Sequence, residues 1–182
     1  ADAVRAEQVM NELSEAAVTV VKGGEALPLS KTGRTLVVWT EVRVATEVVE
    51  VIEQSWTLGS ALEARGYGVR EIRIGLDPTE EEAEAVRSAA SGCDNVVFAS
   101  YDACFSESQT ALIRELASSP SHTFVWAAMR TPYDLLQAPE APIYICCYEN
   151  KPAMMTALAG VLAGDIRARA KQPITIGQYA LH

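Results

Sequence analysis

The sequence has few of the residues on which several kinds of site depend. Only two of its 182 residues are histidines, and its four cysteines form no Cys-x-x-Cys pair, so the usual zinc spacings are absent. Aromatic residues make up 7% of the chain, and 24 acidic residues outnumber 15 basic ones. An acidic chain with few aromatic rings suits neither nucleic acid nor an anionic membrane surface. We therefore expect no nucleic acid, no membrane and no metal as partners.

The common nucleotide and nucleophile motifs are also missing. In KGGEALPLSKTGRT (22–35) no glycine stands before Lys31 at P-loop spacing, and the run after Gly33 predicts a strand where a phosphate loop needs a helix. The chain has no Gly-x-Gly-x-x-Gly after a strand and no Gly-x-Ser-x-Gly. The two histidines are His122, which opens a predicted strand, and His182, the last residue, so no His-based nucleophile pair is indicated. We expect no cofactor.

Targeting signals and long apolar runs are absent too. The chain opens at Ala1 without a basic-then-apolar segment, and no apolar run reaches the length of a membrane-spanning helix. The missing Met suggests a processed chain or a piece of a longer protein. Cys146 and Cys147 fall in an apolar run, so we expect buried thiols facing opposite sides of a strand. A reducing, cytoplasmic setting is favoured, with secretion from a bacterium as the alternative.

What the sequence does contain is an alternation of strand and helix patterns. The expected strands are 35–39, 69–74, 95–100, 122–128, 142–148 and 173–176, and the β-branched run 17–22 precedes them. The expected helices are 1–17, 47–65, 106–118 and 151–163, with a turn or short helix at 131–136. A further helix is expected to begin at Asp77-Pro78 and to end near 91–92.

The strands are continuous apolar runs, which indicates burial on both faces. We therefore predict a three-layer α/β/α sandwich with a mostly parallel, doubly wound sheet of about five to six strands. Residues 17–182 carry this domain, and residues 1–16 form an N-terminal helix or linker.

In such a sheet a ligand binds at the carboxyl ends of the strands. The residues expected there are Thr40-Glu41, Tyr101-Asp102, Met129-Arg130 and Tyr148-Glu149-Asn150. Asp102 and Glu149 are candidates for an acid/base pair of the kind that hydrolyses glycosides. The alternative is that both carboxylates cap loops or helix starts.

Three segments, in order, resemble the C-terminal domain of glycoside hydrolase family 3. Ala17-Val-Thr-Val-Val-Lys22 with Ala26-Leu-Pro-Leu29 is similar to the segment that leads into that domain. Thr131-Pro-Tyr-Asp-Leu135 resembles its "NPYDL" motif. The ending of that domain is similar to four segments here: Tyr148-Glu-Asn150, Pro152-Ala153, Leu162–Ile166 and Arg169–Ile176. One difference is that Ala170 replaces the glycine of the family's "GKLP" turn. The resemblance makes 22–35 a lead-in loop that packs on the domain through Ala26–Leu29.

The resemblance implies a role within a larger enzyme. Family 3 enzymes are retaining exo-β-glycosidases whose nucleophilic Asp lies in an N-terminal TIM-like barrel, which this chain lacks. Some members take a general-acid Glu from a long, aromatic-lined loop of the second domain, whereas 101–108 is short here. This favours the β-N-acetylglucosaminidase type, whose acid/base is a His–Asp pair in the barrel. The chain alone is then inactive: it packs on the barrel, meets carbohydrate through it, and lines the sugar site with Met129, Arg130, Tyr133 and Asp134.

Two other functions stay open. The first is a free-standing, flavodoxin-like module that binds a small ligand between Thr40–Glu41 and Ser100–Asp102. The second is a small hydrolase that uses Asp102 and Glu149. The Pro-Tyr-Asp turn also has a purely structural explanation, because Pro presets a backbone angle and Asp accepts hydrogen bonds from nearby N–H groups.

Overall fold

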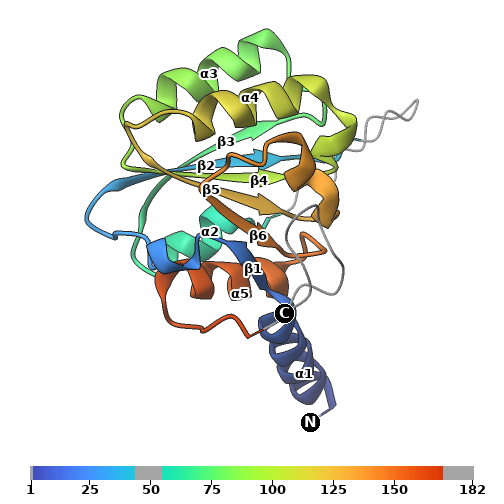
Figure 1. The fold of residues 1–182 in the computed structure, drawn as a ribbon. Coiled ribbons are helices and arrows are strands. Elements are labelled where there is room, and N and C mark those ends of the chain that lie inside the picture. The colour runs from blue at the N-terminus through green and yellow to red at the C-terminus, as the bar shows by residue number, and fades with distance from the viewer. Residues whose placement is uncertain (1, 44–54, 170–182) are drawn as a thin grey trace.

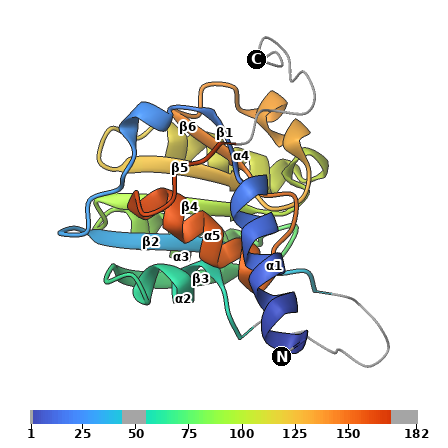
Figure 2. The ribbon, with the colours of Figure 1, turned by 90° about the horizontal axis from the view of Figure 1, so that it is seen from below.

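A computed structural model describes residues 2–43 and 55–169, which form a six-stranded sheet between two layers of helices (Figures 1 and 2). Five strands run parallel: β2 (Arg34–Thr40), β3 (Gly68–Ile74), β4 (Asn95–Ser100), β5 (Thr123–Ala128) and β6 (Ile143–Cys146). β1 (Thr19–Lys22) pairs antiparallel with β6, giving the order β1-β6-β5-β4-β2-β3. The prediction of a mostly parallel, doubly wound sheet is confirmed. The predicted strand 173–176 lies outside the described residues.

The helices divide between the two faces of the sheet. They are α1 (Asp2–Ala17), α2 (Leu58–Glu63), α3 (Glu80–Ala90), α4 (Glu107–Ala117) and α5 (Pro152–Ala163), with short 3₁₀ turns η1 (Gly24–Ala26), η2 (Ala103–Phe105) and η3 (Pro132–Gln137). α3 and α4 cover one face and α2 and α5 the other, while α1 packs against α5 and extends away from the sheet (Figure 1). Among the described residues, no helix combines the length and apolar character that crossing a bilayer requires.

The continuous apolar strands contribute side chains to two separate hydrophobic cores, one on each face of the sheet. Successive side chains point to opposite faces, so Val97 joins the core under α2 and α5 while Phe98 joins the core under α3 and α4. The adjacent thiols follow the same rule, with Cys146 in the second core and Cys147 in the first. The prediction that they face opposite sides of a buried strand is confirmed. All four cysteines are free.

The lead-in loop packs on the domain as expected. Gly23 takes a left-handed conformation (φ 73°), and a Cβ at this position would collide with the carbonyl oxygen of Pro142. Further on, the Leu29 N–H donates to the Leu162 carbonyl at 2.8 Å, and the Tyr67 hydroxyl donates to the Leu29 carbonyl at 2.8 Å. Leu29 is thereby buried against α5.

One predicted helix start is wrong, and part of another predicted helix is not helical. α3 begins after Thr79, whose side chain accepts from the Glu82 N–H in a capping box, and not at Asp77-Pro78. Residues 55–57 of the helix predicted over 47–65 are not helical, because Thr57 is the N-cap of α2. Residues 47–54, the first part of that prediction, lie outside the described residues, so its predicted start stays a prediction.

The α3 cap makes stability depend on pH. Burial opposes ionisation of Glu82, but the Thr79 N–H, the Arg43 guanidinium and the Gly75 N–H outweigh it and lower the pKa of that carboxyl below its ordinary 4.5. A lowered pKa means that the charged form stabilises the fold above pH 4.5 and that this stabilisation is lost as pH falls through the folded-state pKa. Glu82→Gln should therefore cost about 0.5–1 kcal/mol at pH 7. Urea unfolding at pH 7 and pH 3 checks this, and a cost that stays the same at both pH values would contradict it.

Candidate functional site

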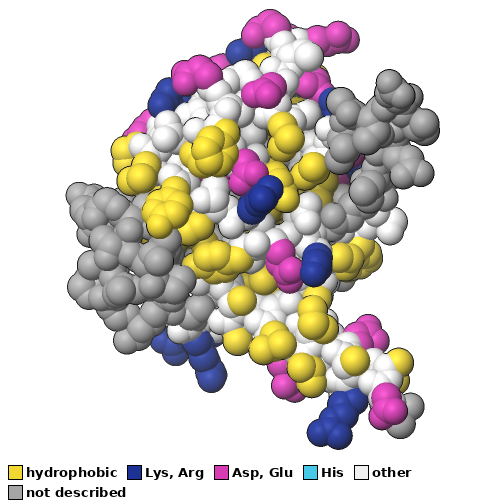
Figure 3. Space-filling model, turned by 90° about the vertical axis from the view of Figure 1, so that its right-hand side faces the viewer, with side chains coloured by type: hydrophobic (Ala, Val, Ile, Leu, Met, Phe, Trp, Pro, Cys, Tyr) yellow, Lys and Arg dark blue, Asp and Glu magenta, His cyan; other side chains and the backbone are white. Residues whose placement is uncertain are grey.

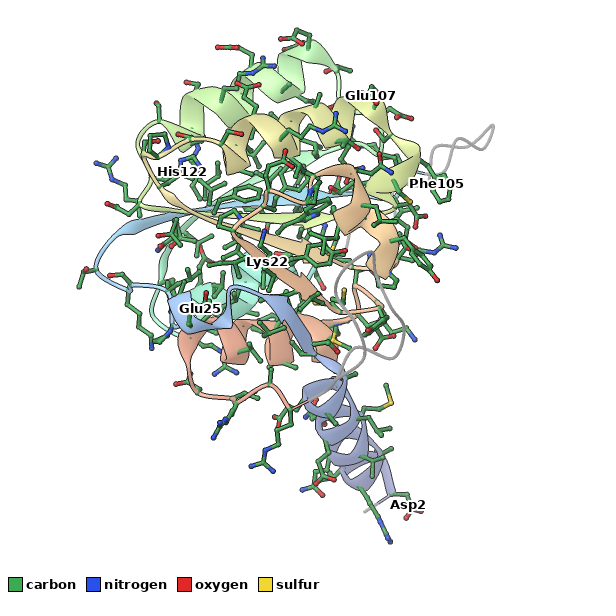
Figure 4. All side chains as sticks on the ribbon, viewed as in Figure 1. Asp2, Lys22, Glu25, Phe105, Glu107 and His122 are labelled. Carbon is green, nitrogen blue, oxygen red and sulfur yellow. The ribbon has the colours of Figure 1, made fainter. Side chains whose placement is uncertain are left out.

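All five parallel strands end on the same side of the molecule, the side that faces the viewer in Figure 3, which is the edge where we predict that a ligand binds. Asp102, Arg130, Tyr133 and Glu149 follow β4, β5 and β6 there. His122 lies at the opposite edge, at the start of β5 (Figure 4), where its ring nitrogens contact Ser121 Oγ and the Leu116 carbonyl. It takes no part in the strand-end site, and His182 lies outside the described residues.

Arg130 is held in place by two residues that follow β4. Its Nη1 lies 3.0 Å from Asp102 Oδ2, and its guanidinium lies 5.4 Å from the centre of the Tyr101 ring. Asp102 adopts a left-handed backbone conformation (φ 51°). The ion pair is partly exposed, so we expect it to orient Arg130 more than to stabilise the fold. Arg130 keeps donors free toward solvent, as its side chain is 59% exposed.

Asp134, in contrast, is fully buried and organises the loop beside it. Its carboxylate accepts from the Cys104 N–H at 2.9 Å, the Ala103 N–H at 3.2 Å and the Ser100 hydroxyl at 3.0 Å. Trp126 Nε1–H in turn donates to Ser100 Oγ at 2.8 Å. Burial raises the pKa of the Asp134 carboxyl, and these N–H and O–H donors oppose the rise. Asp134 thus joins η3 to η2 from below and does not reach the surface.

This anchoring leaves three large apolar side chains exposed at the strand ends. Phe105 on η2 is 84% exposed, Tyr133 49% and Leu136 52%, and Figure 4 shows Phe105 pointing outward from this edge. The sequence reasoning named Tyr133 but missed the other two. For Phe105 the available signal was a second aromatic residue, after Tyr101, in the short segment that follows β4.

The carboxylates proposed as an acid/base pair are placed apart. Asp102 pairs with Arg130, whereas Glu149 lies 3.5 Å from Lys151 Nζ. The strands that carry them, β4 and β6, are separated by β5. Each carboxylate therefore faces a cation of its own, in two surface ion pairs.

The switch point of the sheet, where a flavodoxin-like ligand would sit, is occupied by the buried side chain of Gln109. Its Oε1 accepts from the Tyr101 N–H at 3.1 Å and the Thr40 hydroxyl at 3.4 Å. Its Nε2 donates to the carbonyls of Leu76 and Tyr101 at 3.0 and 3.2 Å. The amide thus satisfies the backbone groups that a ligand would otherwise contact.

The carboxylate that follows β2 is also engaged in ion pairs. Glu41, after β2, is bound by Arg73 and Arg43 at 3.1 and 3.3 Å. Hollows of about 510 and 440 Å³ lie elsewhere, between α1 and residues 165–169 and at the amino ends of β2 and β3. Across residues 2–43 and 55–169, no three His, Cys, Asp or Glu side chains gather as metal ligands would.

Comparison with known proteins bears on the family. No protein-family model and no curated protein matches the sequence. Among solved structures, a glycoside hydrolase family 3 β-N-acetylglucosaminidase from Paenibacillus sp. str. FPU-7 shares 40% identity, with a TM-score of 0.82, over 87% of this chain and 30% of that one. A fungal multi-domain family 3 β-N-acetylglucosaminidase shares 20% identity (TM-score 0.71), over 92% of this chain and 19% of its own.

A β-glucosidase from Listeria innocua in complex with isofagomine shares 14% identity (TM-score 0.68), over 86% of this chain and 25% of its own. At this identity, as with the fungal enzyme, the likeness shows the fold alone. The chain spans less than a third of each of these three proteins. The match to the Paenibacillus enzyme extends through most of the sheet and its helices, and on this basis the chain belongs to glycoside hydrolase family 3, as a C-terminal α/β domain of that family.

Proposed function

We propose that this chain is the non-catalytic C-terminal domain of a family 3 glycoside hydrolase whose parent is a retaining exo-β-N-acetylglucosaminidase. The observation that carries the proposal is the 40% identity to the Paenibacillus β-N-acetylglucosaminidase, over 87% of this chain but only 30% of that enzyme. Residues 17–182 form the domain, residues 1–16 lead into it, and the partner is the TIM-like barrel of the parent. The free cysteines favour a bacterial cytoplasm over secretion.

The absence of catalysis in the isolated chain follows from the chemistry of a retaining glycosidase. That mechanism needs two carboxyl groups about 5 Å apart. At the strand ends of this chain, Asp134 is buried under η2, and Asp102 and Glu149 each face a cation. We infer that the barrel supplies both the nucleophilic carboxylate and the general acid/base, and that a His–Asp pair can take the place of the second carboxyl group.

The domain contributes to sugar binding through its strand-end face. Arg130 offers N–H donors that suit hydroxyl or amide oxygens, and the half-exposed Tyr133 ring offers an apolar platform for a sugar. Asp134 acts on the same site indirectly, by holding η2 and η3 together.

An assay of two species tests the proposal. We expect no turnover of 4-nitrophenyl N-acetyl-β-glucosaminide by the 182-residue chain, and turnover by a longer species from the native source that contains this sequence. In that species Arg130→Ala should raise KM about tenfold, the loss of about 1.4 kcal/mol of charged hydrogen bonding. Glu149→Gln, the matched control, should leave turnover intact. Turnover by the isolated chain, abolished by Asp102→Asn or Glu149→Gln, would replace the proposal with a small hydrolase.

A second candidate, the small-ligand module, is favoured by one observation. The parallel strands β2 to β6 have the order of a flavodoxin, with its switch point between β2 and β4. The Gln109 side chain occupies that point, which is why we place this function second. A thermal shift of the chain with flavin mononucleotide would reverse this ranking.

A further inference from the structure

Exposed apolar side chains lie on α1 and on the loops at the strand ends. Eight large apolar residues of the described part are exposed: Val4, Val9, Met10 and Leu13 on α1, Phe105, Tyr133 and Leu136 on η2 and η3, and Trp56. Figure 3 shows apolar side chains on both α1 and the strand-end loops, turned toward the same viewer. Patches of this kind on a protein surface mark interaction sites.

Within residues 2–43 and 55–169, one apolar face of α1 is left exposed. Ala6, Val9, Met10 and Leu13 follow helical spacing and are all exposed, whereas the only buried residue of the 16-residue α1 is Ser14. A helix of this length is only marginally stable by itself in water. Its apolar face therefore needs a partner surface if α1 is to stay helical along its whole length.

In the loop part of this surface, η2 holds its exposed aromatic side chain on a rigid turn. Phe105 is the most exposed large apolar side chain of the described residues, yet it sits on a turn whose N–H groups are fixed by the buried Asp134. An aromatic side chain presented on a rigid turn loses little freedom when it is covered. Such residues act as anchors at the centre of interfaces.

We propose that Val9, Met10 and Leu13 of α1, together with Phe105 and Leu136, form one two-part docking face for the remainder of the family 3 chain. This inference rests on the proposed function, since it assumes that the chain is one domain of a larger enzyme. The matched Paenibacillus enzyme supplies the occupant: 70% of its length has no counterpart in this chain, enough for a companion of more than twice the size.

The net charge argues against a second copy of the chain as the occupant of the docking face. The net charge is −9, so two copies repel each other. Contact areas between domains, roughly 600–1,500 Å², are of the size that a helix face plus two loops provides.

Hydrogen exchange tests the docking face. Backbone amides of 6–13, 103–106 and 132–137 should exchange about tenfold or more slowly in the longer native species than in the 182-residue chain. Met10→Gln with Leu13→Gln should abolish the protection on the helix part, and Phe105→Ser with Leu136→Ser that on the loop part. Glu25→Ser, a change at an equally exposed site on η1, is the control and should leave the protection unchanged. Thermal melts of the isolated variants verify that each remains folded.

The outcomes separate the two proposals. If the longer species hydrolyses the glucosaminide but the three segments exchange as in the isolated chain, the docking face is wrong and the proposed function stands. If the segments are protected but the longer species does not hydrolyse the glucosaminide, the docking face stands and the proposed substrate is wrong. Concentration-dependent protection in the 182-residue chain itself, with a dimer in sedimentation, would assign the face to a second copy and overturn the proposal. A source that holds no longer species would overturn it as well.

Discussion

Replacing Asp134 by alanine is expected to lower the free energy of unfolding by about 4 kcal/mol, because it leaves the buried N–H of Ala103 and the N–H of Cys104 without an acceptor. The Ser100 hydroxyl, which also holds Trp126 in place, loses its acceptor too. For a chain of this size the melting temperature should fall by about 10 °C. Urea unfolding and a thermal melt check both numbers, and a loss under about 1 kcal/mol would show that water replaces the carboxylate.

The conservative change Asp134→Asn keeps the shape of the side chain and removes its ability to ionise. Burial raises the folded-state pKa of Asp134, so its contribution to stability is fully present below the ordinary pKa of an aspartate and is lost as pH rises through the raised value. The cost of Asp134→Asn should therefore be larger at pH 4 than at pH 7. A cost that grows toward neutral pH would mean that the donors around the carboxylate outweigh its burial.

Replacing Gln109 by leucine, which has a similar volume, should cost about 3 kcal/mol. The change removes the acceptor for the Tyr101 N–H and the donor for the carbonyls of Leu76 and Tyr101, all beside a fully buried side chain. Urea unfolding measures the loss. Ala111→Leu, on the exposed face of the same helix, is the matched control and should change stability by no more than about 0.5 kcal/mol.

Gln109→Leu also bears on function. If the amide only closes the switch point, the variant in its longer parent should keep its KM for the glucosaminide while it melts at a lower temperature. A raised KM with an unchanged melting temperature would instead place Gln109 in ligand binding. The second result would revive the small-ligand module, whose proposed site lies at the same strand ends.

The sheet was predictable because most of its strands are short apolar runs, rich in β-branched residues and bounded by turn residues. Asn95–Ser100 is buried at every position, and such short, β-branched runs predict interior strands. The helix starts were harder, since apolar spacing alone does not show where a helix begins. In Asp77-Pro-Thr79 two good capping residues compete, and the Glu three residues after Thr79 decides between them.

The site was predictable only in part, for a different reason. Strand ends are local features, so the residues that meet at this edge followed from the order of strands. Whether a polar side chain there points outward, like Arg130, or inward, like Asp134 and Gln109, depends on neighbours distant in sequence. No local pattern distinguishes a buried amide that fills a crevice from an exposed one on a helix surface.

The adjacent thiols of Cys146 and Cys147 can report separately on the two helical layers of the protein. Burial raises the pKa of Cys146 to about 12 and that of Cys147 also well above the usual thiol range, so neither is a nucleophile while the fold is closed. One lies under α3 and α4 and the other under α2 and α5. Alkylation of Cys146 therefore marks separation of the α3 and α4 layer from the sheet, and alkylation of Cys147 marks separation of the α2 and α5 layer. Two neighbouring residues at the end of β6 thus record which side of the domain opens first.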